Sequence, residues 1–135
     1  MRYVKISKQE LQRTYALYES VMSQASHGLL FREGVIVGDE LAKVALAEGG
    51  NYFPTAEKLL VGRGWADEAR LEKDRAVFKG SMEGSFFKGC HRLRGIVKSL
   101  YEAKLGAKLD IEEVECEGKT GDNCIFRIAT HVDRK

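Results

Sequence analysis

The sequence has little of several residue types that mark particular classes of protein. Its 135 residues include one proline, three histidines and three cysteines, and 22 basic residues nearly balance 20 acidic ones. The small net charge of +2 argues against a protein that binds nucleic acid through a large phosphate-neutralising surface. Three cysteines cannot all pair within one chain, so in a reducing compartment we expect thiols or metal ligands.

Long apolar segments are also missing. No apolar run approaches the roughly 18 residues of a membrane-spanning helix, and the amino terminus lacks the basic and then apolar pattern of a secretory signal. We therefore expect a cytoplasmic protein without a membrane span. No repeat or linker-like segment divides the chain, so residues 1–135 are predicted to form a single domain.

Signatures of catalysis are absent as well. With three scattered histidines, no Ser–His–Asp or Cys–His arrangement can be argued, and no nicotinamide or flavin fingerprint occurs. The Gly-Lys-Thr sequence at residues 118–120 lacks the earlier glycine of a phosphate-binding loop, because Glu113 occupies that position. We expect no enzymatic activity.

The first half of the chain predicts helices. Ser7 and Glu10 have capping-box spacing, so a first helix is expected to begin there. A second helix is expected over residues 31–48. Small residues that would let another backbone or a ligand come close recur along it: Gly34, Gly38, Ala42 and Ala45.

The second half mixes strands with one long helix. A short helix at Pro54 precedes weak strands over residues 67–80, and a long amphipathic helix is predicted over residues 83–104. The chain then ends in a β-hairpin, residues 109–118 and 124–131. Because helices come first and the best strands last, we expect an α+β fold with helices packed on one face of a mainly antiparallel sheet.

The stretch ECEGKTGDNC, residues 115–124, places a cysteine at each shoulder of that hairpin. If the hairpin turns symmetrically, Cys116 and Cys124 face each other with Cβ atoms about 4.5–5.5 Å apart. This spacing exceeds the ~3.8 Å preferred by disulfides but suits two thiolates on one zinc ion. Cys90, on the apolar face of the long helix, would join them. Buried packing of the cysteines is the alternative, and both interpretations stay open on spacing alone.

Residues 84–128, GSFFKGCHRLRGIVKSLYEAKLGAKLDIEEVECEGKTGDNCIFRI, carry a resemblance to a known family. They resemble the carboxy-terminal half of the vinyl-4-reductase (4-vinyl reductase) domain. This small-molecule-binding module occurs alone in archaea and as the sensor of aromatic-responsive transcription activators. The resemblance implies a zinc site with three cysteines and one glutamate. In this sequence the matching ligands are Cys90, Glu113, Cys116 and Cys124.

The proposed fourth ligand sets a condition on the strand that carries it. Strict alternation places Glu113 and Cys116 on opposite faces, so coordination by both requires a β-bulge between them. Without the bulge, Glu112 or a histidine would have to substitute. His91 is expected to be a solvated surface residue. Four protein ligands would leave no position for a reactive water, so the predicted role of zinc is structural.

The resemblance also implies a mostly apolar cavity beside the metal. Lining candidates, each of which also suits plain core packing, are Phe53, Trp65, Phe78, Phe86, Leu100 and Ile111. The aromatic-sensing relatives carry hydroxyl-bearing aromatics where this chain has Leu100 and Ile111. Hydrocarbon at these positions favours a more apolar ligand, because a pocket without polar partners cannot stabilise a buried hydroxyl.

Together these features predict a sensor or carrier domain for a small hydrophobic or aromatic molecule. A homodimer formed through the first two helices is expected, with a downstream protein partner that detects ligand occupancy. One alternative is a structural dimerisation and assembly module, because the same fold is similar to subunits of TRAPP vesicle-tethering complexes. Another is an accessory protein in the reduction of a tetrapyrrole vinyl group.

Overall fold

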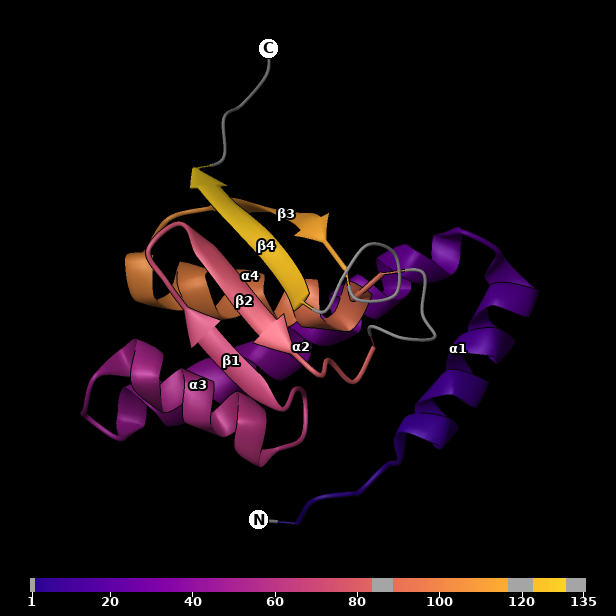
Figure 1. The fold of residues 1–135 in the computed structure, drawn as a ribbon, viewed down its shortest axis with the longest axis horizontal. Helices are drawn as coiled ribbons and strands as arrows, with labels where there is room; N and C mark the ends of the chain where they lie inside the picture. Colours follow the sequence, from indigo (N-terminus) through magenta and orange to yellow (C-terminus); the bar gives the residue numbers. More distant parts are fainter. Residues whose placement is uncertain (1, 84–88, 117–122, 131–135) are drawn as a thin grey trace.

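The computed structural model describes residues 2–83, 89–116 and 123–130. Within these ranges the chain forms an α+β fold, as predicted from the sequence (Figure 1). The antiparallel sheet has the strand order β1-β2-β4-β3. In chain order the elements are α1 (Lys8–Met22), α2 (Ala25–Ala47), α3 (Tyr52–Gly62), β1 (Glu68–Leu71), β2 (Arg75–Lys79), α4 (His91–Leu105), β3 (Leu109–Glu115) and β4 (Asn123–Thr130).

The first helix begins where the local signal predicted. The Ser7 side chain accepts a hydrogen bond from the Glu10 backbone, and the Glu10 carboxylate accepts one from the Ser7 backbone, which completes the capping box. α1 extends away from the sheet (Figure 1). Its contact with α2 centres on Tyr15 and Leu30, which form a small hydrophobic cluster of their own.

Helix α2 packs closely against α4 through glycine. A Cβ atom added at Gly34 would lie 1.9 Å from the Arg92 carbonyl oxygen, and one at Gly95 would lie 2.2 Å from the Phe31 carbonyl oxygen. The small residues of α2 therefore admit another backbone, one of the two roles predicted for them. α2 begins at Ala25, six residues earlier than expected, although Gly28 lowers the helix propensity there.

The predicted start of the long helix at residue 83 is wrong. α4 begins at His91, because Gly89 has a φ of 145° and Cys90 is not helical. Glu83 instead lies under the helix start, where its carboxylate accepts hydrogen bonds from the backbone N–H groups of Arg92 and Leu93. The predicted positions Phe86 and Phe87 fall outside the described residues.

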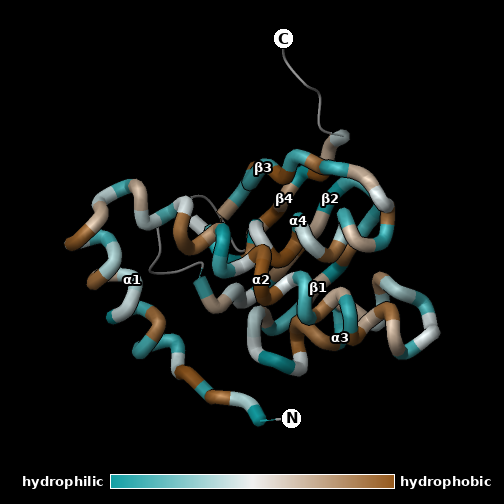
Figure 2. The backbone as a smooth tube through the Cα atoms, turned by 180° about the vertical axis from the view of Figure 1, so that it is seen from behind, coloured by the Kyte–Doolittle hydropathy of each residue, from teal (hydrophilic) through white to brown (hydrophobic). Residues whose placement is uncertain are grey.

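The main core lies between the sheet and the helices α2, α3 and α4. Hydrophobic stretches gather where these elements meet, whereas hydropathy alternates along α1 (Figure 2). The inward residues of β2 and β4 alternate with exposed ones, as the strand period requires. In the described part of the chain no helix has the length and apolar character needed to cross a bilayer.

Candidate metal centre

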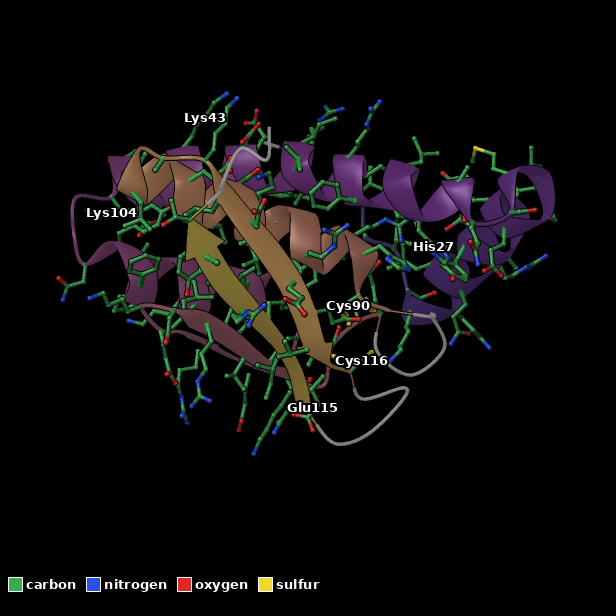
Figure 3. All side chains as sticks on the ribbon, turned by 90° about the horizontal axis from the view of Figure 1, so that it is seen from above. His27, Lys43, Cys90, Lys104, Glu115 and Cys116 are labelled. Carbon is green, nitrogen blue, oxygen red and sulfur yellow. The ribbon has the colours of Figure 1, made fainter. Side chains whose placement is uncertain are left out.

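Three cysteine side chains meet at the amino-terminal end of α4. Cys90 is the N-cap of α4, Cys116 directly follows β3, and Cys124 lies near the start of β4. Their Sγ atoms all lie within 4.8 Å of one another, and those of Cys90 and Cys124 are 3.2 Å apart. All three residues are buried, and Figure 3 shows Cys90 beside Cys116. The predicted convergence of the helix and the hairpin at this point is therefore observed.

The spacing of the sulfur atoms fits a zinc ion. A tetrahedral Zn²⁺ about 2.3 Å from each thiolate holds its sulfur ligands roughly 3.8 Å apart. The Cys90–Cys124 separation of 3.2 Å is shorter than that value, and no pair of the three sulfur atoms is more than 4.8 Å apart. Thiolates are also the donors that zinc prefers in structural sites. The three cysteines therefore form a donor set that could hold this metal.

Glu113 reaches the same point through an irregularity in β3. Glu113 pairs with Phe126 of β4 but Glu115 pairs with Ile125, so one extra residue of β3 is inserted between them. This is the bulge that the sequence required between Glu113 and Cys116. The Glu113 Oε2 atom accepts a hydrogen bond of 2.9 Å from the Cys90 backbone N–H. Its carboxylate thus lies against the Cys90 backbone, whereas the group of ligand atoms within 4.8 Å of one another comprises the three cysteine sulfur atoms.

The surroundings of Cys90 disfavour an isolated thiolate. Hydrogen bonds with Cys116 and Cys124, together with burial, raise the pKa of Cys90 well above its ordinary value. The Ser81 hydroxyl lies 3.3 Å from the Cys90 Sγ atom. It lowers the pKa of Cys90, because it can donate a hydrogen bond to the thiolate. Ionising all three cysteines therefore requires a nearby positive charge, which a divalent ion supplies.

Buried charges connect this centre to α2. Glu83 is fully buried, and desolvation raises its pKa to about 7 even though backbone N–H groups and Arg92 favour its charged form. Arg92 lies 3.6 Å from Glu83 and donates to Glu33 of α2 at 2.8 Å. The segment before Cys90 is therefore attached to both helices. Sequence analysis missed Glu83, because its partners are nine and ten residues away in the chain.

A hollow of about 420 Å³ adjoins the cysteines on the side of α2. It is lined by His27, Gly28, Cys90, His91, Arg94, Ile111, Glu112 and Glu113. His91 is partly buried, not solvated as predicted, because its ring stacks on that of His27 with 4.1 Å between centroids. Figure 3 shows His27 on the cysteine side of α2. Most of the lining side chains are polar or charged.

Arg94, which lines this hollow, is a second residue that sequence analysis missed. Its guanidinium lies over the Phe31 ring, 4.1 Å from the centroid, and desolvation lowers its pKa. Arg94 follows His91 by three residues, and this spacing places the two side chains on the same face of a helix. That interval was the available signal.

The predicted ligand-contacting residues fall into three groups. Ile111 lines the hollow beside Cys90. Phe78 and Leu100 are fully buried in the main core, and the partly buried Phe53 and Trp65 pack against that core. Phe86 lies outside the described residues. Ligand contact by these side chains stays a prediction.

Solved structures share this fold, although no family model and no curated protein matches the sequence. The phenol-responsive sensory domain of the transcription activator PoxR, solved with phenol, aligns at a TM-score of 0.80 and 15% identity. That alignment covers 96% of this chain and 77% of the sensory domain.

A vinyl-4-reductase family protein from Methanocaldococcus jannaschii aligns at a TM-score of 0.67 and 15% identity. This alignment covers 97% of the present chain and 85% of the archaeal one. At this identity the two likenesses establish the fold. The chain has the fold of the vinyl-4-reductase type, which is the fold that its sequence resemblance implied.

Proposed function

We propose that the chain is a cytoplasmic, zinc-stabilised domain that binds a small hydrophobic or aromatic molecule as a sensor or carrier. The observation that carries this proposal is the meeting of three buried cysteine sulfur atoms within 4.8 Å of one another. The fold supports it, because one structural neighbour is a phenol-responsive sensory domain.

In this proposal Cys90, Cys116, Cys124 and Glu113 hold the ion. Four protein ligands close a tetrahedral site and leave no position for a reactive water, so the metal has a structural role. Cys90 is the N-cap of α4, whereas the other three ligands belong to the β3–β4 hairpin. The ion would therefore fasten the helix to the hairpin and contribute its binding energy to folding.

The proposed ligand lies against the apolar core between the helices and the sheet. Its proposed contacts are Phe53, Trp65, Phe78, Leu100 and Ile111, with Phe86 from outside the described residues. The buried hydroxyls of Tyr52 and Tyr101 already donate to backbone carbonyls. A polar ligand atom in this region would find few partners, and this supports an apolar ligand.

We also propose a homodimer through the first two helices and a downstream protein that responds to ligand occupancy. Four hydrophobic side chains of these helices are more than half exposed: Leu17, Val21, Ile36 and Leu46. Exposed apolar side chains at helical spacing are typical of interaction surfaces. The same observation favours a second candidate function, a structural dimerisation module related to TRAPP subunits.

Native mass spectrometry of gently purified protein distinguishes these two functions. A stoichiometric non-peptide mass in addition to the metal supports the sensor or carrier. A dimer that carries only metal supports the assembly module instead.

Metal analysis tests the proposed centre. Wild-type protein is expected to contain close to one zinc ion per chain, and Cys116→Ser and Cys124→Ser to lose most of it, since each substitution removes one thiolate ligand. Circular dichroism would verify that the variants retain their secondary structure. Equal zinc content in all three proteins would contradict the proposal.

A further inference from the structure

The hollow beside the cysteines is open to solvent and separate from the apolar core. Its walls come from the first turn of α2, the first turn of α4 and the middle of β3. Its volume of about 420 Å³ lies within the range of small-molecule sites. The proposed apolar ligand would not fit its lining, because charged and imidazole side chains make up most of it. The hollow therefore requires a different kind of ligand.

Arg94 supplies a positive charge to the hollow, and the Glu113 carboxylate balances part of this charge without forming a direct ion pair. Of the residues that the structure describes, none brings a carboxylate oxygen within the 4.0 Å ion-pair distance of its guanidinium. Among the described residues, the guanidinium of Arg94 donates one hydrogen bond, from Nη1 to the Ile111 carbonyl, and this bond is long, at 3.5 Å. A guanidinium has five N–H donors in a planar fork that matches a carboxylate. The remaining donors are therefore available to an anion in the hollow.

The neighbouring basic side chains are not available in this way. Arg92 is engaged by Glu33 and Glu83, and Lys98 is engaged by Glu102 at 2.7 Å. Arg94 instead lies over the Phe31 ring, and this contact restricts the movement of its guanidinium. A fixed and partly desolvated cation recognises an anion at a lower entropic cost than a mobile surface lysine does.

The acidic wall limits the charge of that anion. Glu112 pairs with Arg127, and Glu113 accepts a hydrogen bond from the Cys90 backbone. Both carboxylates line the hollow, so they repel negative charge while Arg94 attracts it. One guanidinium facing two carboxylates favours a monoanion over a phosphate dianion.

Gly28 leaves room for the ligand. A Cβ atom added at Gly28 would have no neighbouring atom within 4 Å, whereas Gly34, six residues later, is required by helix packing. The missing side chain at Gly28 keeps the α2 side of the hollow open. A larger residue there would fill the hollow without disturbing the core.

We infer that this hollow binds the carboxylate group of a small organic acid, with the Arg94 guanidinium as its charge partner and the stacked His27 and His91 rings as a polar wall. The inference goes beyond the proposed function and does not depend on it. The hollow shares Cys90 and Glu113 with the proposed metal centre and Ile111 with the proposed apolar contacts, but the inferred contacts of the acid are Arg94, His27 and His91.

Isothermal titration with sodium benzoate tests the inference, with benzamide as a neutral compound of the same shape and inorganic phosphate as a dianion. We expect benzoate to bind with a Kd of about 1 mM or tighter, and both comparison compounds to bind at least about tenfold more weakly. Equal binding of benzoate and benzamide would overturn the inference. Absence of benzoate binding, or preferential binding of phosphate, would overturn it as well.

Two variants remove the site in different ways. Arg94→Gln removes the charge and Gly28→Leu fills the hollow, so each is expected to weaken benzoate binding at least about tenfold. Gly62→Leu is the matched control, since Gly62 also has open space around it but lies on α3. Unchanged benzoate binding in Gly28→Leu would overturn the inference even if Arg94→Gln failed to fold.

Zinc content measured on the same samples separates the two proposals. Full zinc without benzoate binding counts against the carboxylate site alone. Benzoate binding in a protein that never contains zinc counts against the metal centre alone.

Discussion

The backbone N–H of Cys90 donates a 2.9 Å hydrogen bond to the carboxylate of Glu113, 23 residues later in the chain. The bond joins the N-cap of α4 to the residue of β3 where the bulge begins, and these two segments bring the cysteines together. It positions the Glu113 carboxylate in the absence of a metal. The candidate fourth ligand is therefore oriented in advance, and this lowers the entropic cost of coordination.

Glu113→Gln separates that orienting role from metal coordination. Glutamine keeps an oxygen that accepts the hydrogen bond from Cys90, but it removes the negative charge that a zinc ligand supplies. We expect the fold to be retained and the zinc affinity to fall by about tenfold to a hundredfold. Competition with a chromogenic chelator measures the affinity. The neighbouring exposed substitution Glu112→Gln is the control and should leave zinc affinity almost unchanged. Equal affinities of Glu113→Gln and wild type would exclude Glu113 as a ligand.

Zinc removal should lower stability substantially. A ligand that binds only the folded state at about a thousand times its Kd stabilises by roughly 4 kcal/mol. Thermal unfolding with and without a strong chelator should therefore show a clear fall in Tm for wild type. Cys124→Ser is expected to unfold at the lower temperature under both conditions. A wild-type Tm that does not respond to complete, verified zinc removal would show that the ion does not hold the helix to the hairpin.

Two glycines of α2 should respond oppositely to alanine. Gly34→Ala places a methyl group against the Arg92 carbonyl oxygen, so overpacking is expected to cost about 3 kcal/mol. Gly28→Ala meets open space in a helix and should stabilise by about 0.5–1 kcal/mol, because alanine loses less backbone entropy on folding. Urea unfolding of both variants measures the difference. Similar midpoints for the two variants would contradict the close α2–α4 contact.

Features set by neighbouring residues were the ones that sequence analysis located well. The capping box of Ser7 and Glu10 fixed the start of α1, since both partners lie within one turn. The period of two along a strand predicted that Glu113 and Cys116 could converge only with a bulge, and the bulge is present. The cysteine cluster could be predicted in the same way, from hairpin register together with an apolar helix face.

Features set by distant residues were missed. Glu83, outside the helix, accepts hydrogen bonds from the first-turn N–H groups of Arg92 and Leu93, and no local propensity reports such a partner. The stacking of His91 on His27 depends on how closely α2 approaches α4, and the glycines at their contact determine that distance. The polar hollow also depends on how closely α2 approaches α4. Its lining residues come from α2, α4 and β3, so they could not be predicted from the sequence of any one segment.

Glu83 should make stability depend on pH in an unusual direction. Burial raises its pKa from 4.5 to about 7 in the folded protein, so between these values the folded state keeps a proton that the unfolded chain has released. Stability from this group is therefore lost as pH rises from about 4.5 to 7, by roughly 3 kcal/mol in total, and is unaffected by pH below that window.

Other groups titrate in the same range, so the quantity to measure is the difference in the free energy of unfolding between wild type and Glu83→Gln. Glutamine keeps a neutral oxygen for the N–H groups of Arg92 and Leu93 but cannot ionise. Urea unfolding at several pH values should show wild type losing stability relative to Glu83→Gln as pH rises. A difference that is constant, or that grows in favour of wild type, would mean that Arg92 and the helix start keep the Glu83 carboxylate charged throughout.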